Sequence, residues 1–232
     1  MAFLLENVVP WGRTRDEYIK MFSLSDNDLS KKIASFGDGP ASFNYESTIN
    51  NGDVISFDII YQFSKEEIEI QINKTKEIIL NQLKQNMENY VWTDIKSVDE
   101  LKEMRARAMK LFLNDFNKGK ADGRYLYHEL PNKTKYKENY FDIGLSSHFL
   151  LMYTKLGYEF HIKTITEMLR ICREIRITPI VDLNGNHSDL TTNVIEYFKN
   201  DYDVKVLNTN YNFLKNGNKM LCIMKNYPLE FP

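Results

Sequence analysis

The chain has 232 residues, 43% of them hydrophobic, and a formal charge of −2 from 30 basic and 32 acidic side chains. This length suffices for one domain with its own core, and the balanced charge excludes the global basic signature of a nucleic-acid-binding protein. No stretch approaches the roughly 20 apolar residues that span a bilayer, and the N-terminus lacks a signal-peptide pattern, so we expect a soluble, non-membrane chain.

The first predicted element is a helix that begins at Thr14, because Thr14 and Glu17 have the spacing of a capping box. A short apolar strand at residues 33–36 then leads into the run Gly37-Asp38-Gly39-Pro40. The proline of this run suits the first turn of a helix, since its missing N–H would be unpaired there anyway. The pattern therefore predicts strand, tight turn and helix.

That helix should end near Asn50-Asn51-Gly52, and a second strand at residues 54–57 should end at Asp58, completing a β-α-β unit. Residues 63–122 interrupt the alternation and predict a helical insertion. Two capping-box spacings open its helices, at Ser64 with Glu67 and at Ser97 with Glu100. The charge run 102–110 is typical of a solvated helix face.

Strands are next predicted at 124–127 and 141–146, followed by a helix at 158–174, a strand at 175–181 and a helix at 190–200. The last two strands, 204–207 and 219–224, are separated only by a polar stretch with Asn216-Gly217-Asn218. No helix fits between them, so we expect an antiparallel hairpin at the end of an otherwise parallel sheet.

The glycine run has the features of a ligand loop. Gly37 can adopt a positive φ, and Gly39 lets backbone approach a ligand closely. Asp58 follows Gly39 by nineteen residues, a spacing at which a carboxylate accepts hydrogen bonds from both ribose hydroxyls. A dinucleotide site needs a third glycine where this chain has Ser42. That difference and the terminal hairpin disfavour a nicotinamide-dependent oxidoreductase.

Three segments, F-G-D-G-P-A-S-F-N, V-I-S-F-D and Y-F-D-I-G-L-S-S-H, resemble the class I S-adenosylmethionine (SAM)-dependent methyltransferases. The resemblance covers residues 33–225 apart from the insertion, and the P-W-G-R opening is similar to that of a bacterial subgroup. It implies one Rossmann-like α/β domain over residues 1–232, with a doubly wound, seven-stranded, mostly parallel sheet. Residues 63–122 would form the insertion and residues 1–30 an N-terminal helical cover. The implied activity is methyl transfer from SAM to an unidentified, small-molecule acceptor.

The resemblance also implies the cofactor contacts. These are Gly37, Asp38 and Gly39 around the methionyl part, Asp58 and Ile59 at the ribose, His128 and Glu129 at the adenine edge, and Ser146 and Ser147, with His148, beside the methyl group. Two positions depart from the family pattern, because Ser35 stands where an acidic residue is usual and Ala41 where a glycine is frequent. The chain also lacks the Asn/Asp-Pro-Pro-Tyr signature of amino-group methylation on bases and glutamine.

Several side chains have two interpretations. His148 suits proton transfer, since histidine titrates near neutral pH, or a structural hydrogen bond. Arg13 either pairs with the cofactor carboxylate or is solvated, while Trp11 anchors its segment. Tyr90 and Trp92 line a substrate pocket or pack helices.

We expect no metal, because no ligand spacing joins the four histidines. Cys172 and Cys222 lie within apolar runs, which indicates buried thiols in a reducing, cytoplasmic compartment.

The second hypothesis for the function is a noncatalytic SAM-fold module that binds a ligand or partner, and it rests on Ser35 and on the absence of an acceptor motif.

Overall fold

The computed structural model describes residues 10–226, so residues 1–9 of the expected N-terminal cover lie outside the described part. The strands are β1 (Lys32–Phe36), β2 (Asp53–Asp58), β3 (Tyr125–Tyr127), β4 (Phe141–Ser147), β5 (Cys172–Thr178), β6 (Tyr202–Asn208) and β7 (Lys219–Lys225). The α-helices are α1 (Arg15–Phe22), α2 (Asp26–Leu29), α3 (Phe43–Ile49), α4 (Lys65–Gln85), α5 (Val98–Ala121), α6 (Tyr158–Ile171) and α7 (Asp189–Phe198). Short 3₁₀ helices are η2 (Ile59–Gln62), η3 (Met87–Asn89) and η4 (Thr154–Leu156).

The seven strands form one sheet in the order β3-β2-β1-β4-β5-β7-β6. Strands β1 to β5 pair in parallel, and β7 runs antiparallel to both of its neighbours, β5 and β6. The predicted Rossmann-like, mostly parallel sheet with a C-terminal antiparallel hairpin is therefore confirmed. Strand order reverses between β1 and β4, and ligands of open α/β sheets bind beyond the carboxyl ends of the strands at such a point.

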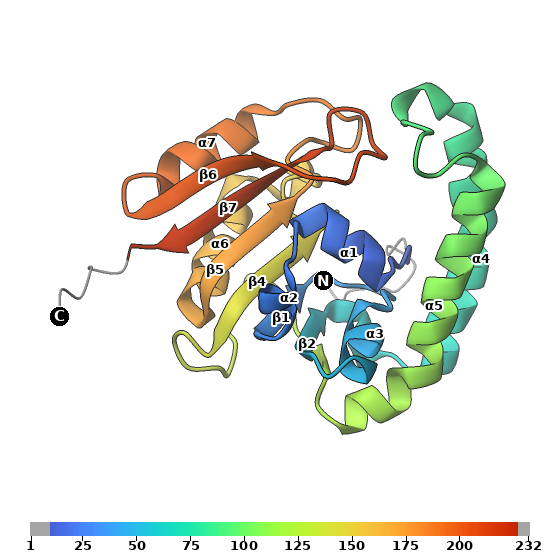
Figure 1. Ribbon diagram of the computed structural model, residues 1–232, viewed down its shortest axis with the longest axis horizontal. Coiled ribbons are helices and arrows are strands. Elements are labelled where there is room, and N and C mark those ends of the chain that lie inside the picture. The colour runs from blue at the N-terminus through green and yellow to red at the C-terminus, as the bar shows by residue number, and fades with distance from the viewer. Residues whose placement is uncertain (1–9, 227–232) are drawn as a thin grey trace.

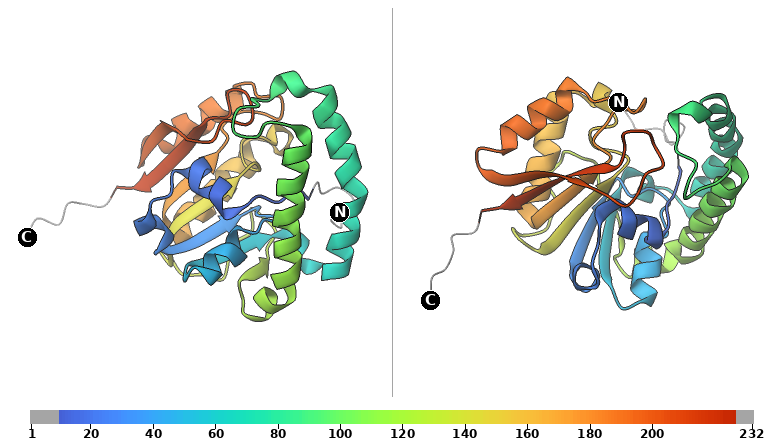
Figure 2. Two further views of the ribbon diagram at one scale, coloured as in Figure 1. Left: turned by 45° about the vertical axis from the view of Figure 1, so that its right-hand side comes forward. Right: turned by 45° about the horizontal axis from the view of Figure 1, so that its top comes forward.

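Helices cover both faces of the sheet (Figure 1). Helices α1, α2 and α3 lie on one face, and α6 and α7 lie on the other, where they bury the largest apolar cluster against β1, β4 and β5. The two further views of Figure 2 show that α4 and α5 form a long antiparallel pair beside the sheet. A second apolar cluster, which includes Ile60, Tyr61 and Phe112, joins this pair to the end of β2.

The predicted capping boxes explain where two helices begin. Thr14 and Glu17 form the full reciprocal box of α1, and Ser64 and Glu67 form that of α4. At α5 only half of the box is present. Ser97 accepts the Glu100 N–H, but the Glu100 carboxylate accepts from the Lys96 N–H instead.

Two predicted helix boundaries are wrong, and the strand predicted at 175–181 spans Cys172–Thr178. Helix α3 begins at Phe43 rather than at Pro40, because the Ser42 N–H donates to the Arg13 carbonyl at 2.9 Å and the preceding residues stay in an open loop. Helix α6 ends at Ile171, since Cys172 already pairs with Phe141 of β4. A Cβ on Gly144 of β4 would lie 2.8 Å from the Cys172 sulfur, so a larger residue there would require the Cys172 side chain to shift.

Candidate active site

The glycine loop follows β1 at the reversal point of the sheet. Gly37 and Gly39 both have left-handed backbones, with φ of 64° and 55°. A Cβ on Gly37 would lie 2.7 Å from the Phe149 ring, so the protein itself requires glycine there. A Cβ on Gly39 would meet no other atom of residues 10–226 within 4 Å. The space over Gly39 is therefore open to a ligand.

Asp58 ends β2 and is bound directly to this loop. Its Oδ2 accepts the Gly39 N–H at 2.8 Å and its Oδ1 accepts the Ile60 N–H at 2.9 Å. Burial raises the pKa of Asp58 to about 6; the two N–H donors oppose this rise and the nearby charge of Asp38 adds to it. Each carboxylate oxygen has a second lone pair, so Asp58 can still accept from a ligand. Ile59 follows at the start of η2.

Asp38 lies between the two glycines, but its carboxylate points into the protein. Oδ1 accepts from the hydroxyls of Tyr18 and Ser35, the latter at 2.5 Å, and Oδ2 accepts from the Ser56 hydroxyl at 2.5 Å. The side chain is only 6% exposed. Of the expected cofactor contacts, Asp38 is thus available through its backbone and not through its carboxylate.

The end of β4 lies beside the glycine loop, since Ser146 pairs with Phe36. Ser146 is fully buried, and its Oγ has no hydrogen-bond partner within residues 10–226. Ser147 Oγ lies 3.1 Å from His148 Nδ1. His148 has a φ of 53°, uncommon for a non-glycine residue and typical of functional sites.

The half-buried His148 ring is neutral at neutral pH. Burial, together with the charges of Arg13 and Arg105, lowers the pKa of His148 well below its ordinary value. Because the Ser147 hydroxyl donates to the Met21 sulfur at 3.9 Å, its oxygen accepts from His148 Nδ1–H, and in this tautomer Nε2 is free to accept a proton from a ligand. The Tyr211 ring packs edge-on against the His148 ring, with ring centroids 6.3 Å apart.

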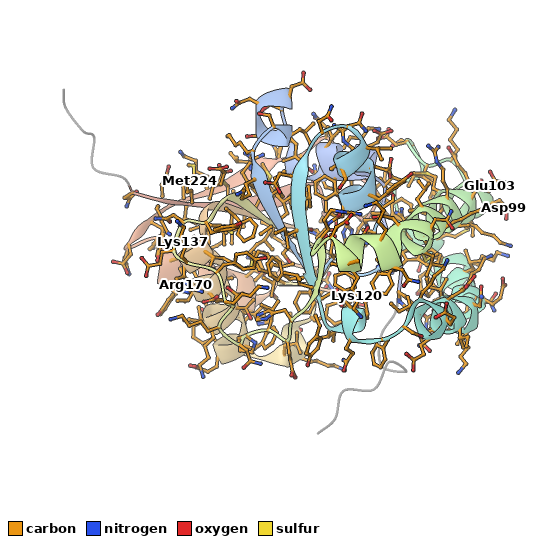
Figure 3. All side chains as sticks on the ribbon, turned by 90° about the horizontal axis from the view of Figure 1, so that it is seen from below. Asp99, Glu103, Lys120, Lys137, Arg170 and Met224 are labelled. Carbon is orange, nitrogen blue, oxygen red and sulfur yellow. The ribbon has the colours of Figure 1, made fainter. Side chains whose placement is uncertain are left out.

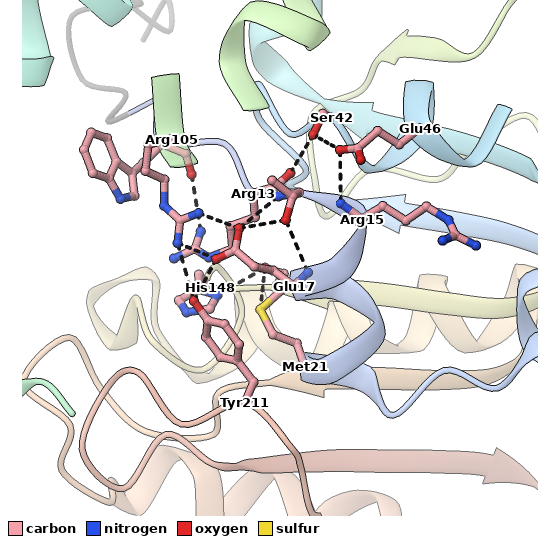
Figure 4. Close-up of polar contacts among 12 residues, drawn as sticks. Arg13, Arg15, Glu17, Met21, Ser42, Glu46, Arg105, His148 and Tyr211 are labelled. Carbon is pink, nitrogen blue, oxygen red and sulfur yellow. Dashed lines mark hydrogen bonds and ion pairs between the residues drawn. The ribbon is translucent and has the colours of Figure 1, made fainter. Parts of the chain in front are cut away.

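A buried polar cluster of Glu17, Arg105 and Tyr211 adjoins His148 (Figure 4). Both oxygens of Glu17 accept from the Arg105 guanidinium at 2.6 Å, and the Tyr211 hydroxyl donates to Glu17 Oε1 at 2.9 Å. The exposed fractions are 3% for Glu17, 1% for Arg105 and 8% for Tyr211. The cluster joins α1, α5 and the loop between β6 and β7.

Neither Arg105 nor Tyr211 was singled out by the sequence analysis. The expectation of a solvated face for residues 102–110 is wrong at Arg105, although Asp99 and Glu103 on the same helix do point outward (Figure 3). The signal was present, because Arg105 lies at helical spacing among buried apolar residues, namely Leu101, Ala108, Met109 and Phe112.

Arg13 lies next to this cluster without a carboxylate of its own among the described residues. Its guanidinium donates to the Trp11 carbonyl at 3.3 Å, and its buried Nε has no partner there. The Arg13 carbonyl accepts the Ser42 N–H, and a Cβ on Gly12 would overlap the Pro40 carbonyl at 2.0 Å. The segment that carries Arg13 is therefore packed directly on the residues that follow the glycine loop.

The expected adenine residues lie on the other side of Asp58. A cavity of about 220 Å³ is lined by Phe57, His128, Tyr136 and neighbouring residues of β3 and the loop 133–136. His128 Nε2 lies 3.0 Å from the Asn132 carbonyl oxygen, and burial lowers the pKa of His128. Glu129 is exposed and is not among the residues that line this cavity.

The described residues contain no group of three or more His, Cys, Asp or Glu side chains arranged to hold a metal ion. Within residues 10–226, no helix has the length and apolar character to cross a membrane. Both cysteines are buried free thiols, as predicted. The rings of Tyr90 and Trp92 pack against Phe213 of the β6–β7 loop, and their place in a substrate pocket stays a prediction.

Sheet order and the loop after β1 define the class as a doubly wound, Rossmann-like α/β protein with a candidate nucleotide-type site. No protein-family model matches the chain. An uncharacterized protein of Methanocaldococcus jannaschii is 37% identical over 223 residues, which cover 95% of this chain and 98% of that protein. The chain belongs to the family of this archaeal protein. The expected bacterial subgroup is not confirmed.

Three solved structures of methyltransferases have similar chain paths. A putative SAM-dependent methyltransferase of Methanococcus maripaludis has a TM-score of 0.43 and 11% identity, over 94% of this chain and 85% of that one. Magnesium protoporphyrin IX methyltransferase of Synechocystis, solved with bound SAM, has a TM-score of 0.47 and 11% identity, over 91% and 78%. A SAM-dependent methyltransferase of Aquifex aeolicus has a TM-score of 0.40 and 14% identity, over 91% and 88%.

Proposed function

We propose that this chain is a cytoplasmic SAM-dependent methyltransferase that acts on a small-molecule acceptor. The observation that carries the proposal is the bond between the Gly39 N–H and Asp58 at the reversal point of the sheet. This bond holds the backbone of Gly39, which has open space above it, next to the carboxylate of Asp58, which would accept hydrogen bonds from the ribose hydroxyls. The residues 63–122 and the N-terminal segment would form its walls.

The residues present fit this cofactor. Open space over Gly39 admits the methionyl part, and Asp58 with its remaining lone pairs accepts from the ribose hydroxyls. Arg13 supplies a guanidinium that has no carboxylate partner among residues 10–226, which suits the cofactor's carboxylate. His128 borders a cavity that would take the adenine end, although Glu129 does not line it. We further propose Ile59 at the ribose and Ser147 near the methyl group.

When bound, SAM supplies a methyl group on a positively charged sulfonium. The chain's own contribution is alignment and exclusion of water, because Glu17, Arg105 and Tyr211 hold three segments together beside His148. In this proposal, Nε2 of the neutral His148 accepts a proton from an acceptor O–H or N–H. Both carboxylate oxygens of Glu17 are hydrogen-bonded, so Glu17 would hold these segments together rather than transfer a proton.

Calorimetric titration with S-adenosylhomocysteine (SAH), the demethylated product, tests the proposal, with NAD as a parallel ligand. Asp58→Asn should weaken SAH binding about 10- to 100-fold, because hydrogen bonds to a charged acceptor contribute about 1.5–3 kcal/mol each. Asp201→Asn, an exposed residue far from the loop, is the matched control. Absence of SAH and SAM binding by the wild type, or tight binding of NAD alone, would overturn the assignment.

A noncatalytic SAM-fold module is the second candidate, favoured by Ser35 in place of the usual acid and by the inward-facing Asp38. It shares the binding prediction but differs in turnover. Release of SAH from SAM in the presence of any acceptor of a small-molecule panel would reject it, and loss of that release in His148→Gln would assign the proton transfer.

A further inference from the structure

The carboxylate of Asp38 is held by hydroxyl groups from three separate elements. They are Tyr18 of α1, Ser35 of β1 and Ser56 of β2. The same residue stands between two glycines with left-handed backbones. Anchoring its side chain inward therefore fixes the direction in which the backbone of the loop faces.

Tyr18 is the one of these three donors that does not belong to the strands flanking the loop. Tyr18 is 2% exposed. Its ring stacks on the Phe43 ring, with centroids 4.3 Å apart and an interplanar angle of 9°. Burial, together with the charge of Asp38, raises the pKa of Tyr18 well above its ordinary value, so the hydroxyl stays protonated and donates. The ring cannot swing away without leaving Phe43.

The position of Tyr18 is in turn set by the start of α1. Glu17, its neighbour, closes the capping box with Thr14 and forms the bidentate ion pair with Arg105 of α5. A chain of contacts thus runs from the helical insertion through α1 to the glycine loop. The links are hydrogen bonds between buried side chains, joined by the backbone of α1 between Glu17 and Tyr18.

We propose that Tyr18 is a positioning residue of the cofactor site, which holds the glycine loop in its ligand-accepting conformation through the carboxylate of Asp38. The inference rests on the proposed function for the identity of the ligand. Without the hydroxyl, one oxygen of a buried carboxylate loses a donor and the loop samples other conformations. The apparent affinity for a ligand then falls in proportion to the fraction of molecules whose loop has the binding-competent conformation.

The test combines Tyr18→Phe with a control that has the same chemistry elsewhere. Tyr125 is 1% exposed, and its hydroxyl donates to the Asp115 carboxylate at 3.1 Å rather than to a group of the loop. Its ring packs on Tyr61, whose hydroxyl donates to the Gly39 carbonyl at 2.8 Å, and Tyr125→Phe keeps this ring contact. Both variants remove one buried hydroxyl from one carboxylate. We expect Tyr18→Phe to weaken SAH binding about tenfold by calorimetry and Tyr125→Phe to leave it unchanged, at comparable losses of thermal stability.

Ser35→Ala provides a second route to the same loss if Tyr18→Phe does not fold. Ser35→Thr, which keeps a hydroxyl, should restore affinity. Wild-type affinity in both Tyr18→Phe and Ser35→Ala would overturn the positioning role.

Amide hydrogen exchange in the ligand-free protein separates this inference from the proposed function. Tyr18→Phe should speed exchange at the Gly39 N–H, which donates to Asp58, and Tyr125→Phe should not. Unchanged exchange at Gly39 overturns the positioning role whatever the ligand. Faster exchange together with no SAH binding by the wild type supports the coupling and overturns only the proposed function.

Discussion

Arg105 and Glu17 place two full charges in a nearly water-free environment. Burial by itself would raise the pKa of Glu17, but the charge and hydrogen bonds of Arg105 outweigh burial and lower it to about 2. The stabilisation that this carboxylate provides is thus present above its unfolded pKa and is lost as the pH falls toward 2. Removal of one partner would leave the other charge buried and unpaired.

We predict that Glu17→Gln lowers the free energy of unfolding by about 3–5 kcal/mol, the typical effect of breaking a buried ion pair. Glutamine keeps the capping box possible, so the change isolates the loss of charge. Urea unfolding at pH 7 measures it, with Asp16→Asn on the exposed side of the same helical turn as control. Equal effects of the two substitutions would show that the ion pair adds nothing to stability.

The pKa of about 6 for Asp58 predicts a pH-dependent affinity. Only the ionised carboxylate accepts from both ribose hydroxyls, so SAH binding should tighten from pH 5 to pH 7 and then level off. In the ligand-free protein, the contribution of Asp58 to stability depends on pH in the opposite direction. A folded pKa above the unfolded value means that the contribution of Asp58 to stability falls as the pH rises from about 4 to about 6.

Calorimetry at pH 5, 6 and 7 measures this dependence. The pKa of Asp38 is also raised, mainly by burial and against its three hydroxyl donors, so Asp58→Asn is needed to assign the slope. That variant should give weak binding that is flat with pH. If the SAH affinity of Asp58→Asn still changed with pH, a group other than Asp58 would be responsible for the pH dependence.

At the scale of elements, the connection between α4 and α5 is tied to the loop between β6 and β7. The Val91 N–H donates to the Phe213 carbonyl at 2.7 Å, and the Lys215 N–H donates to the Asn89 carbonyl at 3.0 Å. The Tyr90 and Phe213 rings stack with centroids 4.9 Å apart. The tip of the helical insertion and the hairpin loop, far apart in sequence, therefore form one unit.

We predict that Phe213→Ala raises hydrogen exchange in both segments together, residues 86–96 and 209–218, because each protects the other's amides. Mass spectrometry of peptic peptides measures the exchange. Tyr197→Ala, a half-exposed aromatic residue on α7, should affect neither segment. Faster exchange confined to residues 209–218 would show that the insertion tip is held by other contacts.

At the scale of the whole molecule, the alternation of strands and helices and the terminal hairpin could be predicted from the sequence. Local hydrophobic period identifies the elements, and the absence of a helix between the last two strands indicates that they pair in antiparallel fashion. The order of the strands in the sheet came from the structure. The start of α3 could not be predicted in the same way. It depends on the Ser42 N–H bond to Arg13, a contact across 29 residues that no local signal encodes.

The sequence by itself determined the fold class, the glycine loop, and the placement of Asp58 at the end of the adjoining strand, since these depend on chain order and on residues a few positions apart. The tertiary structure alone decided that Asp38 turns inward and that Glu17, Arg105 and Tyr211 meet. These contacts join residues 88 and 194 positions apart. Their geometry depends on how the helical pair and the hairpin loop pack over the sheet, and a buried charge becomes favourable only when packing brings its partner within reach.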